Sequence, residues 1–318
     1  MIHTRFIPLC AALLMVLTAA SARASDGRLD VVVSIKPIHA LVAGVMQGVG
    51  TPHLLLNDQQ SPHHFALKPS QARLLQQAEL VFWVDPSLET PMPALLASLA
   101  PHAIDIRFMA DQDLVRYQNK ISDDSDDDHE GHDGHEDHEG HGLGHIVNPH
   151  IWLDLENARR MVWYIAATLS AVDPQHAGAY ASNAAKLDKR LVDLHEVAKR
   201  QFASIQRNKF IVQHDAFIYI ERQFKLPRGL VIARDHDTPP GTAHLQHLRD
   251  LVAAGVVSCI FDERQGAGHQ IDIVVGTSFV RRATLDAVGV GLPAGPDLYF
   301  ELMRANYAAF ADCLAGTQ

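Results

Sequence analysis

The sequence predicts an α/β protein in which two parallel-sheet lobes are linked by one long, rigid helix. Three observations support this prediction. In the first half of the chain, short apolar segments of strand length alternate with segments that have the apolar spacing of helices. One long periodic segment follows, and the alternation then begins again. Such alternation is typical of mainly parallel sheets that are covered by helices on both faces.

The N-terminal lobe is predicted to occupy residues 25–170. Short, mostly apolar runs bounded by polar or turn residues predict its strands, which are residues 31–35, 54–56, 80–84 and 103–106. Apolar residues at spacings of three and four predict its helices, which are residues 38–49 and 70–78. Because strands and helices alternate, we expect the strands to pair in parallel.

The linking helix is predicted within residues 171–206. Asp173-Pro174 marks its start, because proline is well tolerated in the first turn of a helix. Residues 174–205 would form a helix roughly 48 Å long, which exceeds one small lobe. We therefore expect the helix to pack along both lobes of a monomer. A coiled-coil dimer is the competing interpretation, but alanine and tyrosine occupy several of the core positions.

The C-terminal lobe is predicted to occupy residues 207–318. Its predicted strands are residues 210–212, 230–233 and 256–261, and its last helix is residues 297–314. Open α/β sheets bind ligands beyond the carboxyl ends of their strands. Loops of both lobes are therefore expected to face a cleft between the lobes, and the ligand is expected there.

The N-terminus has the pattern of a secretory signal peptide. Arg5 precedes an apolar stretch, residues 9–20, and the small-residue pattern Ala22-Arg23-Ala24 follows. The apolar stretch is too short to span a hydrocarbon layer of roughly 30 Å. We expect cleavage after Ala24, so that residues 1–24 are removed and the protein is periplasmic.

Cysteine content and charge distribution fit an exported protein. Without the signal peptide, Cys259 and Cys313 remain, and an even number is expected in an oxidising compartment. We expect them to form a disulfide, and two buried free thiols are the alternative. The formal net charge is −10, and residues 123–139 contain ten acidic residues and no lysine or arginine. No cluster of basic residues indicates nucleic-acid binding.

An acidic, histidine-rich loop is predicted at residues 122–146. Its composition cannot form a core, so we expect it to be disordered without metal. Its histidines are His129, His132, His135, His138, His141 and His145. Imidazoles among carboxylates bind borderline cations such as zinc, copper or nickel. We expect an auxiliary, weak metal site that raises the local concentration of such a cation or senses its excess, and a solvated acidic loop is the alternative.

Three other histidines are candidates for a preorganised site, because they lie in loops or at the ends of predicted strands. They are His63 in Ser-Pro-His-His-Phe, His150 in Asn-Pro-His-Ile-Trp and His214 in Val-Gln-His-Asp-Ala. Their wide separation along the chain indicates a ligand held between lobes rather than by a local motif. Neutral imidazole nitrogens suit Zn²⁺, whereas manganese prefers more oxygen donors.

These segments together resemble the zinc-binding periplasmic components of ABC importers, a metal-specific branch of substrate-binding proteins. The matching segments are residues 33–37 (Val-Ser-Ile-Lys-Pro), 61–70, the histidine-rich loop, 149–153, 214–217 and 276–278. The resemblance implies two α/β lobes on a long helix, Zn²⁺ as the captured ion and an inner-membrane ABC permease as a transient partner. It also implies that the protein is not an enzyme. Finally, it implies that His63, His150 and His214 bind the metal and that Cys259 and Cys313 form a disulfide.

The fourth metal ligand stays open at this stage. Some zinc-binding members carry a glutamate directly before the first histidine, where this chain has Pro62. Asp286 matches the position of an aspartate ligand in manganese and other members of the wider family, and water and His64 are the alternatives. Hydrogen-bonded partners are expected to fix the tautomer of each imidazole, with Asp215 and Asp154 as the candidates.

Other functions compete with zinc delivery to a permease. A manganese or iron carrier of the same fold is one, and a periplasmic zinc buffer is another. A zinc hydrolase is the third, because three histidines and a water also form a catalytic set. The chain has no His-Glu-x-x-His motif and no evident glutamate base near the candidate ligands, which argues against hydrolysis.

Overall fold

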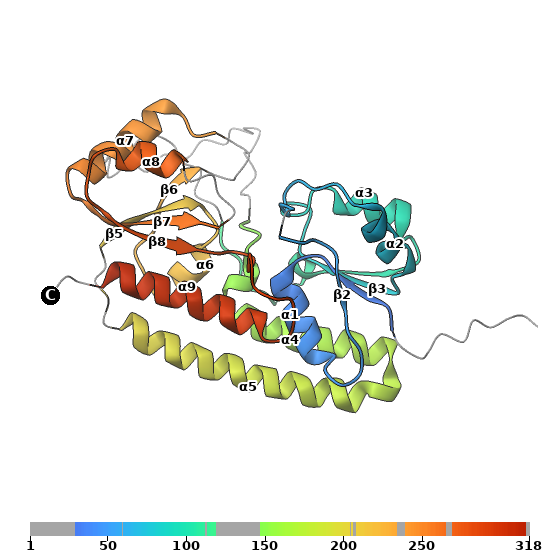
Figure 1. Ribbon diagram of the computed structural model, residues 1–318. Coiled ribbons are helices and arrows are strands. Elements are labelled where there is room, and N and C mark those ends of the chain that lie inside the picture. Colours follow the sequence, from blue (N-terminus) through green and yellow to red (C-terminus); the bar gives the residue numbers. More distant parts are fainter. Residues whose placement is uncertain are drawn as a thin grey trace, which may run out of the picture.

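The computed structural model describes residues 29–315, apart from residues 59, 112, 119–146, 204, 206–207, 234–238 and 265–268. The predicted signal peptide and the histidine-rich loop with its six histidines lie outside the described residues. Figure 1 shows two α/β halves side by side above a long helix. This arrangement agrees with the predicted fold class.

The first half contains a four-stranded parallel sheet with the strand order β2-β1-β3-β4. The central strands β1 (Val31–Val33) and β3 (Leu80–Trp83) are apolar and buried along their whole length. The edge strands β2 (His53–Leu54) and β4 (Ile104–Arg107) are largely exposed. The helices of this half are α1 (Lys36–Val45), α2 (Pro69–Gln77) and α3 (Met92–Leu99). All four predicted strands are present, with ends shifted by one or two residues.

Two long helices form a hairpin beneath the sheets. They are α4 (Leu155–Val172) and α5 (Ala177–Phe202), joined through the 3₁₀ turn η3 (Pro174–His176). Proline was expected in the first α-helical turn, but Pro174 instead starts the 3₁₀ turn. There the Asp173 carboxylate accepts a hydrogen bond from the Tyr180 hydroxyl at 2.7 Å and lies 2.7 Å from His176 Nδ1. Helix α4 was not predicted.

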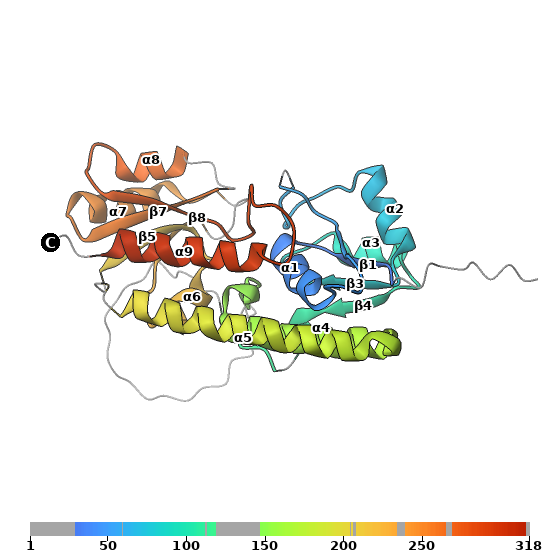
Figure 2. The same ribbon diagram turned by 60° about the horizontal axis from the view of Figure 1, so that its bottom comes forward.

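Helix α5 contacts elements of both halves. It packs against α4, against α1 of the first half and against α9 (Leu298–Leu314) of the second half. Figures 1 and 2 show α5 running beneath the whole molecule, with α9 above one end and α1 near the middle. The apolar face that makes these contacts is the one whose spacing the sequence displays, from Tyr180 to Phe202.

The second half contains another four-stranded parallel sheet, with the order β6-β5-β7-β8. Its strands are β5 (Lys209–His214), β6 (Leu230–Ala233), β7 (Val257–Glu263) and β8 (Arg281–Leu285). Its helices are α6 (Ile218–Gln223), α7 (Thr242–Ala253) and α8 (His269–Val275), followed by α9. Strand β8 was not predicted. The Cys259–Cys313 disulfide, which was predicted, joins β7 to α9.

The apolar core is continuous across the two halves. One cluster of buried side chains includes β1, β3, α1, α4 and α5 as well as β5, β7 and α9. A smaller cluster fills the space between the second sheet and helices α7 and α8. Among the described residues, no helix is both long and apolar enough to cross a membrane. The shared core holds the strand ends of the two sheets in a fixed relation, and the candidate site lies between them.

Candidate metal centre

Two of the three candidate histidines meet directly. His214 is the last residue of β5, and His150 immediately precedes the 3₁₀ turn η2 (Ile151–Leu153) that leads into α4. Both residues are buried, with relative exposures of 3% and 5%. Their Nε2 atoms are 3.4 Å apart. Two nitrogen ligands of one tetrahedral zinc ion, each about 2.0–2.1 Å from the metal, would be about 3.3–3.4 Å apart. The two rings are therefore spaced as ligands of a single ion.

The outer nitrogen of each ring is held by a side-chain oxygen. Nδ1 of His214 lies 2.5 Å from Oε1 of Glu263, which also accepts the His214 backbone N–H at 3.1 Å. Nδ1 of His150 lies 3.0 Å from Oδ1 of Asn148, which also accepts the His150 backbone N–H at 3.0 Å. An acceptor at Nδ1 favours the tautomer that carries its proton there. Nε2 of each ring then directs its lone pair toward the other ring, as metal binding requires.

The two carboxylates that sequence reasoning considered for this orienting role have other partners. Asp154 is the N-cap of α4, where its Oδ1 accepts the backbone N–H groups of Glu156 and Asn157 at 2.7 and 3.0 Å. Asp215 forms an ion pair with Arg228. Burial raises the pKa of Asp215, and the Arg228 guanidinium opposes that shift. The residues that hold the rings are thus Glu263 and Asn148, which sequence reasoning missed.

His63 lies beside this pair but farther away. Its ring centroid is 6.1 Å from that of His150, compared with 5.1 Å between His150 and His214. It belongs to the loop between β2 and α2 and is partly buried, whereas His64 is exposed. Among the described residues, no three His, Cys, Asp or Glu side chains are arranged to hold one ion as they stand. A three-histidine site therefore requires His63 to approach the His150–His214 pair.

Asp286 follows directly after β8 and is buried. Its Oδ1 accepts the backbone N–H groups of Val288 and Gly289 at 3.0 and 2.8 Å. Its Oδ2 lies 3.9 Å from Nε of Arg264. Burial raises the pKa of the Asp286 carboxyl group, against the effect of these hydrogen bonds. Asp286 is thus a buried carboxylate whose orientation is fixed by the turn that follows it.

The segment of Asp286 lies against the segment of His150. Trp152, two residues after His150, donates from its indole Nε1 to the carbonyl oxygen of Ala287 at 2.7 Å. The carbonyl oxygen of Trp152 accepts the Tyr299 hydroxyl of α9, also at 2.7 Å. The structure therefore brings the candidate fourth ligand to the same region of the molecule as the two histidines.

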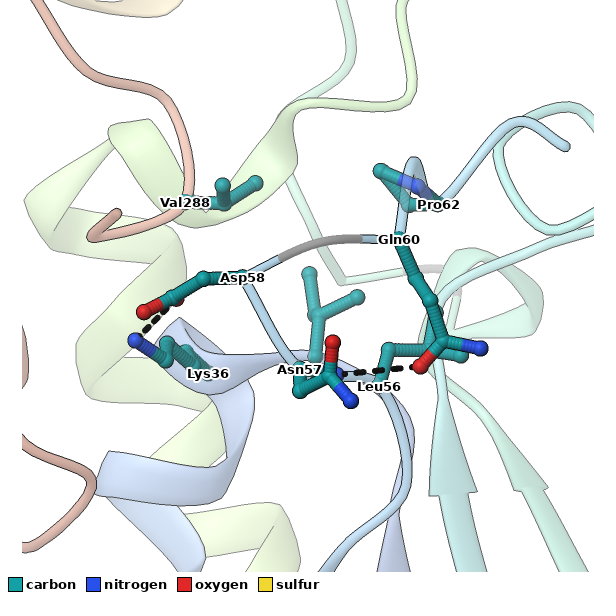
Figure 3. Close-up of a pocket in the computed structure, with 8 residues that line it drawn as sticks. Lys36, Leu56, Asn57, Asp58, Gln60, Pro62 and Val288 are labelled. Carbon is teal, nitrogen blue, oxygen red and sulfur yellow. Dashed lines mark hydrogen bonds and ion pairs between the residues drawn. The ribbon is translucent and has the colours of Figure 1, made fainter. Parts of the chain in front are cut away.

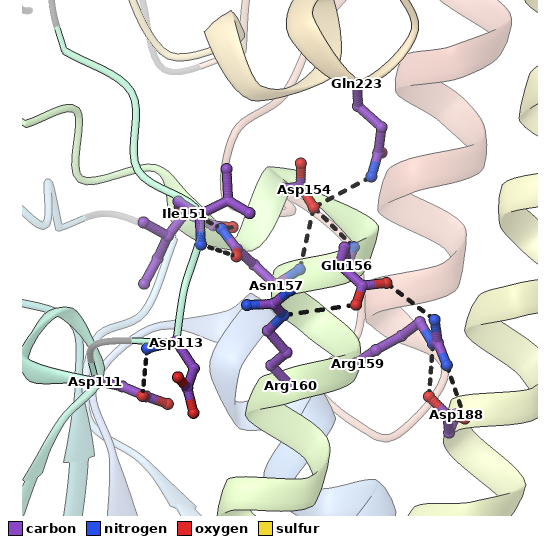
Figure 4. Close-up of polar contacts among 11 residues, drawn as sticks. Asp111, Asp113, Ile151, Asp154, Glu156, Asn157, Arg159, Arg160, Asp188 and Gln223 are labelled. Atoms are coloured by element: carbon purple, nitrogen blue, oxygen red, sulfur yellow. Dashed lines mark hydrogen bonds and ion pairs between the residues drawn. The ribbon is translucent and has the colours of Figure 1, made fainter.

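A polar network fixes the chain on the carboxyl side of His150 (Figure 4). Asn157 of α4 donates to the carbonyl oxygens of Ile151 and Val115 at 3.2 and 2.9 Å. Gln223 of α6 donates to Oδ1 of Asp154 at 3.1 Å and so links the second half to the start of α4. On the other side of His150, the Tyr219 hydroxyl donates to the carbonyl oxygen of Asn148 at 2.7 Å. His150 is therefore held from both halves of the protein.

Comparison with known proteins adds independent information. The family model described as "Zinc-uptake complex component A periplasmic" matches residues 31–313. A high-affinity zinc uptake system protein ZnuA from Paracoccus denitrificans is 37% identical over 298 residues, covering 89% of this chain and 91% of the relative. The protein of the same name from Brucella suis is 34% identical over 308 residues, with 91% and 92% coverage. A solved structure described as "Crystal structure of ZnuA" superposes with a TM-score of 0.75 at 20% identity, covering 90% of this chain and 99% of that one.

Proposed function

Because the chain belongs to the family of periplasmic zinc-uptake complex A components, we propose that it captures Zn²⁺ and delivers it to a membrane ABC importer. One observation carries the proposal beyond family membership. Two buried imidazoles, held at their Nδ1 atoms, face each other with their Nε2 atoms 3.4 Å apart. That spacing suits two ligands of one tetrahedral ion. Zinc is the cargo of this site.

We propose His63, His150 and His214 as the three nitrogen ligands. The last two are preset by Asn148 and Glu263, so little conformational entropy is lost when the ion binds them. His63 completes the set by a movement of its loop toward them. Residues 25–170 and 207–318 then act as two lobes around the ion, with residues 171–206 between them.

We propose Asp286 as the fourth ligand, through Oδ2. Its other oxygen is engaged by the turn at Val288 and Gly289, which leaves the carboxylate fixed in orientation. Three imidazole nitrogens and one oxygen favour zinc, whereas a manganese site needs more oxygen donors.

The same contacts favour binding and transfer over catalysis. A zinc hydrolase needs a base beside the metal-bound water. Glu263 accepts two hydrogen bonds from His214 and therefore orients a ligand. Release to the importer requires only the reverse movement of the His63 loop, because the two halves share one core.

The location and the auxiliary loop belong to the same proposal. We propose that residues 1–24 direct the chain to the periplasm, where its relatives' family is placed by name, and that it acts there as a monomer. The histidine-rich residues 122–146 supply additional, weaker zinc sites.

Chelator competition with the full chain tests the proposal. The wild type should bind one zinc ion tightly, and His150→Ala and His214→Ala should each weaken that site by at least about 100-fold, more than a hydrogen-bonded partner of a ligand would. His176→Ala, which alters a histidine of η3, is the matched control and should leave the affinity unchanged. Wild-type affinity in both ligand variants would overturn the proposal.

A further inference from the structure

One buried lysine joins the two halves beside the metal centre. Nζ of Lys36, the first residue of α1, donates to the carbonyl oxygens of Gly289 and Leu292 at 3.1 and 2.8 Å. It also forms an ion pair with Asp58, whose Oδ2 accepts the Gly291 backbone N–H at 3.2 Å. The Lys36 side chain is only 9% exposed. We call this set of contacts the Lys36–Asp58 bridge.

One end of the bridge leads to Asp286. Gly289, whose carbonyl oxygen accepts from Lys36, donates its N–H to Oδ1 of Asp286 at 2.8 Å. Gly289 has a φ of +84°, and an added Cβ would lie 3.1 Å from the Leu298 side chain. Any other residue would strain this turn. The lysine thus holds the turn that fixes the orientation of the Asp286 carboxylate.

The other end of the bridge leads to His63. Asp58 lies in the loop between β2 and α2, five residues before His63. Figure 3 shows the Lys36–Asp58 ion pair among the residues that line a pocket, together with Pro62 and Val288. The lining of that pocket comes from both halves, because Val288 belongs to the turn of Asp286 and the other lining residues belong to the first half. Pro62 immediately precedes His63, so the bridge and the candidate ligand belong to the same short loop.

We propose that the Lys36–Asp58 bridge positions His63 and Asp286 for zinc by holding their two loops together across the halves. This inference rests on the proposed function. His150 and His214 have their own hydrogen-bonded partners, Asn148 and Glu263. The bridge acts on the other two candidate ligands, which come from opposite halves. Lys36 itself does not bind the metal, so it is a positioning residue.

The chemistry of the bridge suits this role. The ammonium group has three N–H donors, and three acceptors from two loops surround it. A shielded, charged donor of this kind makes stronger hydrogen bonds than a neutral one. Removing the charge leaves buried carbonyl oxygens without a donor, which favours separation of the two loops.

The test compares variants of the full chain in zinc competition assays. Lys36→Met removes the donor, and Asp58→Asn removes the charge of its partner with little change in shape. Each should weaken the tight zinc site by about tenfold, the lower end of the range for residues that orient metal ligands. The double variant should lose no more than the stronger single variant, because both substitutions break one bridge.

A matched control and a spectroscopic readout separate positioning from general support of the fold. Lys189→Met breaks the exposed ion pair that Lys189 forms with Asp193 within α5 and should keep wild-type affinity. Bound Co²⁺ absorbs strongly in the visible range when four-coordinate and weakly when six-coordinate. The bridge variants should lose this absorption in part, and the control should not.

Two results would overturn the inference. One is a zinc affinity of Asp58→Asn that is within twofold of the wild-type affinity. This result can be interpreted even if Lys36→Met fails to fold. The other is an equal loss of zinc affinity in Lys189→Met. If instead the wild type bound no zinc tightly, or if His150→Ala kept full affinity, the proposed function itself would fail. The two failures are therefore distinguishable.

Discussion

Replacing Glu263 with glutamine tests how the protein prepares His214 for zinc. Oε1 of Glu263 lies 2.5 Å from Nδ1 of His214 and 3.1 Å from its backbone nitrogen, and both side chains are buried. Glutamine keeps an acceptor oxygen in the same place but removes the negative charge. The substitution therefore isolates the electrostatic part of the contact.

The expected loss follows from the strength of this contact. Hydrogen bonds to charged groups contribute about 1.5–3 kcal/mol. Changes in the hydrogen-bonded partner of a metal-binding histidine reduce metal affinity by about 10–100-fold. Since Glu263→Gln keeps the acceptor, we expect the lower end, about tenfold or about 1.4 kcal/mol. Glu263→Leu removes the acceptor from two buried donors and should cost about 100-fold.

Chelator competition with the full chain measures both variants, and Glu89→Gln serves as the control. Glu89 is also a fully buried glutamate, but its Oε2 accepts backbone N–H groups of Val84 and Asp85 in the first half. This control should keep wild-type zinc affinity. If Glu263→Leu folds normally and its zinc affinity is within twofold of the wild-type affinity, the claim that Glu263 prepares His214 is refuted.

Three further predictions concern the disulfide, the pH dependence of stability and the histidine-rich loop. Replacing Cys259 and Cys313 with serine removes a crosslink between residues 54 positions apart. The free energy of unfolding, measured by urea titration, should fall by about 4 kcal/mol, and zinc affinity should not change. An unchanged unfolding midpoint would contradict this prediction. Burial raises the pKa of Glu89 from 4.5 to about 7. Between these two pH values the folded state keeps a proton that the unfolded chain releases, so the free energy of unfolding of the wild type falls as the pH rises from 4.5 to about 7. Over the same pH range, the free energy of unfolding of Glu89→Gln, measured in urea, should rise relative to that of the wild type by up to ~3 kcal/mol. A difference between the two proteins that does not change with pH would argue against the raised pKa of Glu89. Deleting residues 123–145 should leave one tight site by calorimetry and remove only weaker ones, and loss of the tight site would show that the loop supplies it.

The sequence predicted most clearly the strands that are buried on both faces. Strands β1 and β3 lie inside a sheet, so they are apolar on both faces and stand out as short apolar runs. Strand β8 was missed because it is an edge strand that begins Arg281-Arg282 and is fully buried only at Leu285. Helix α4 was missed although Asp154 is a good N-cap and apolar residues recur at helical spacing after it.

The sequence indicated the histidines of the candidate site but not the residues that hold them. His214 was recognisable as a candidate because it follows a predicted strand, and the ends of parallel strands form ligand sites. Glu263 could not be assigned to His214 without the sheet, because the two residues are 49 positions apart. They meet because β5 and β7 pair in parallel, with Val212 opposite Phe261, which places the ends of the two strands side by side. The contact of Lys36 with Gly289, 253 positions away, depends on the packing of the two halves and has no local signal.

Anomalous diffraction at the zinc absorption edge, from crystals of the full chain with one equivalent of zinc, tests the central claim most directly. A single strong peak is expected between the two halves, about 2.0–2.1 Å from Nε2 of both His150 and His214, with His63 moved in as a third ligand. A zinc ion bound elsewhere, with the two Nε2 atoms still facing each other across an empty gap, would contradict the claim.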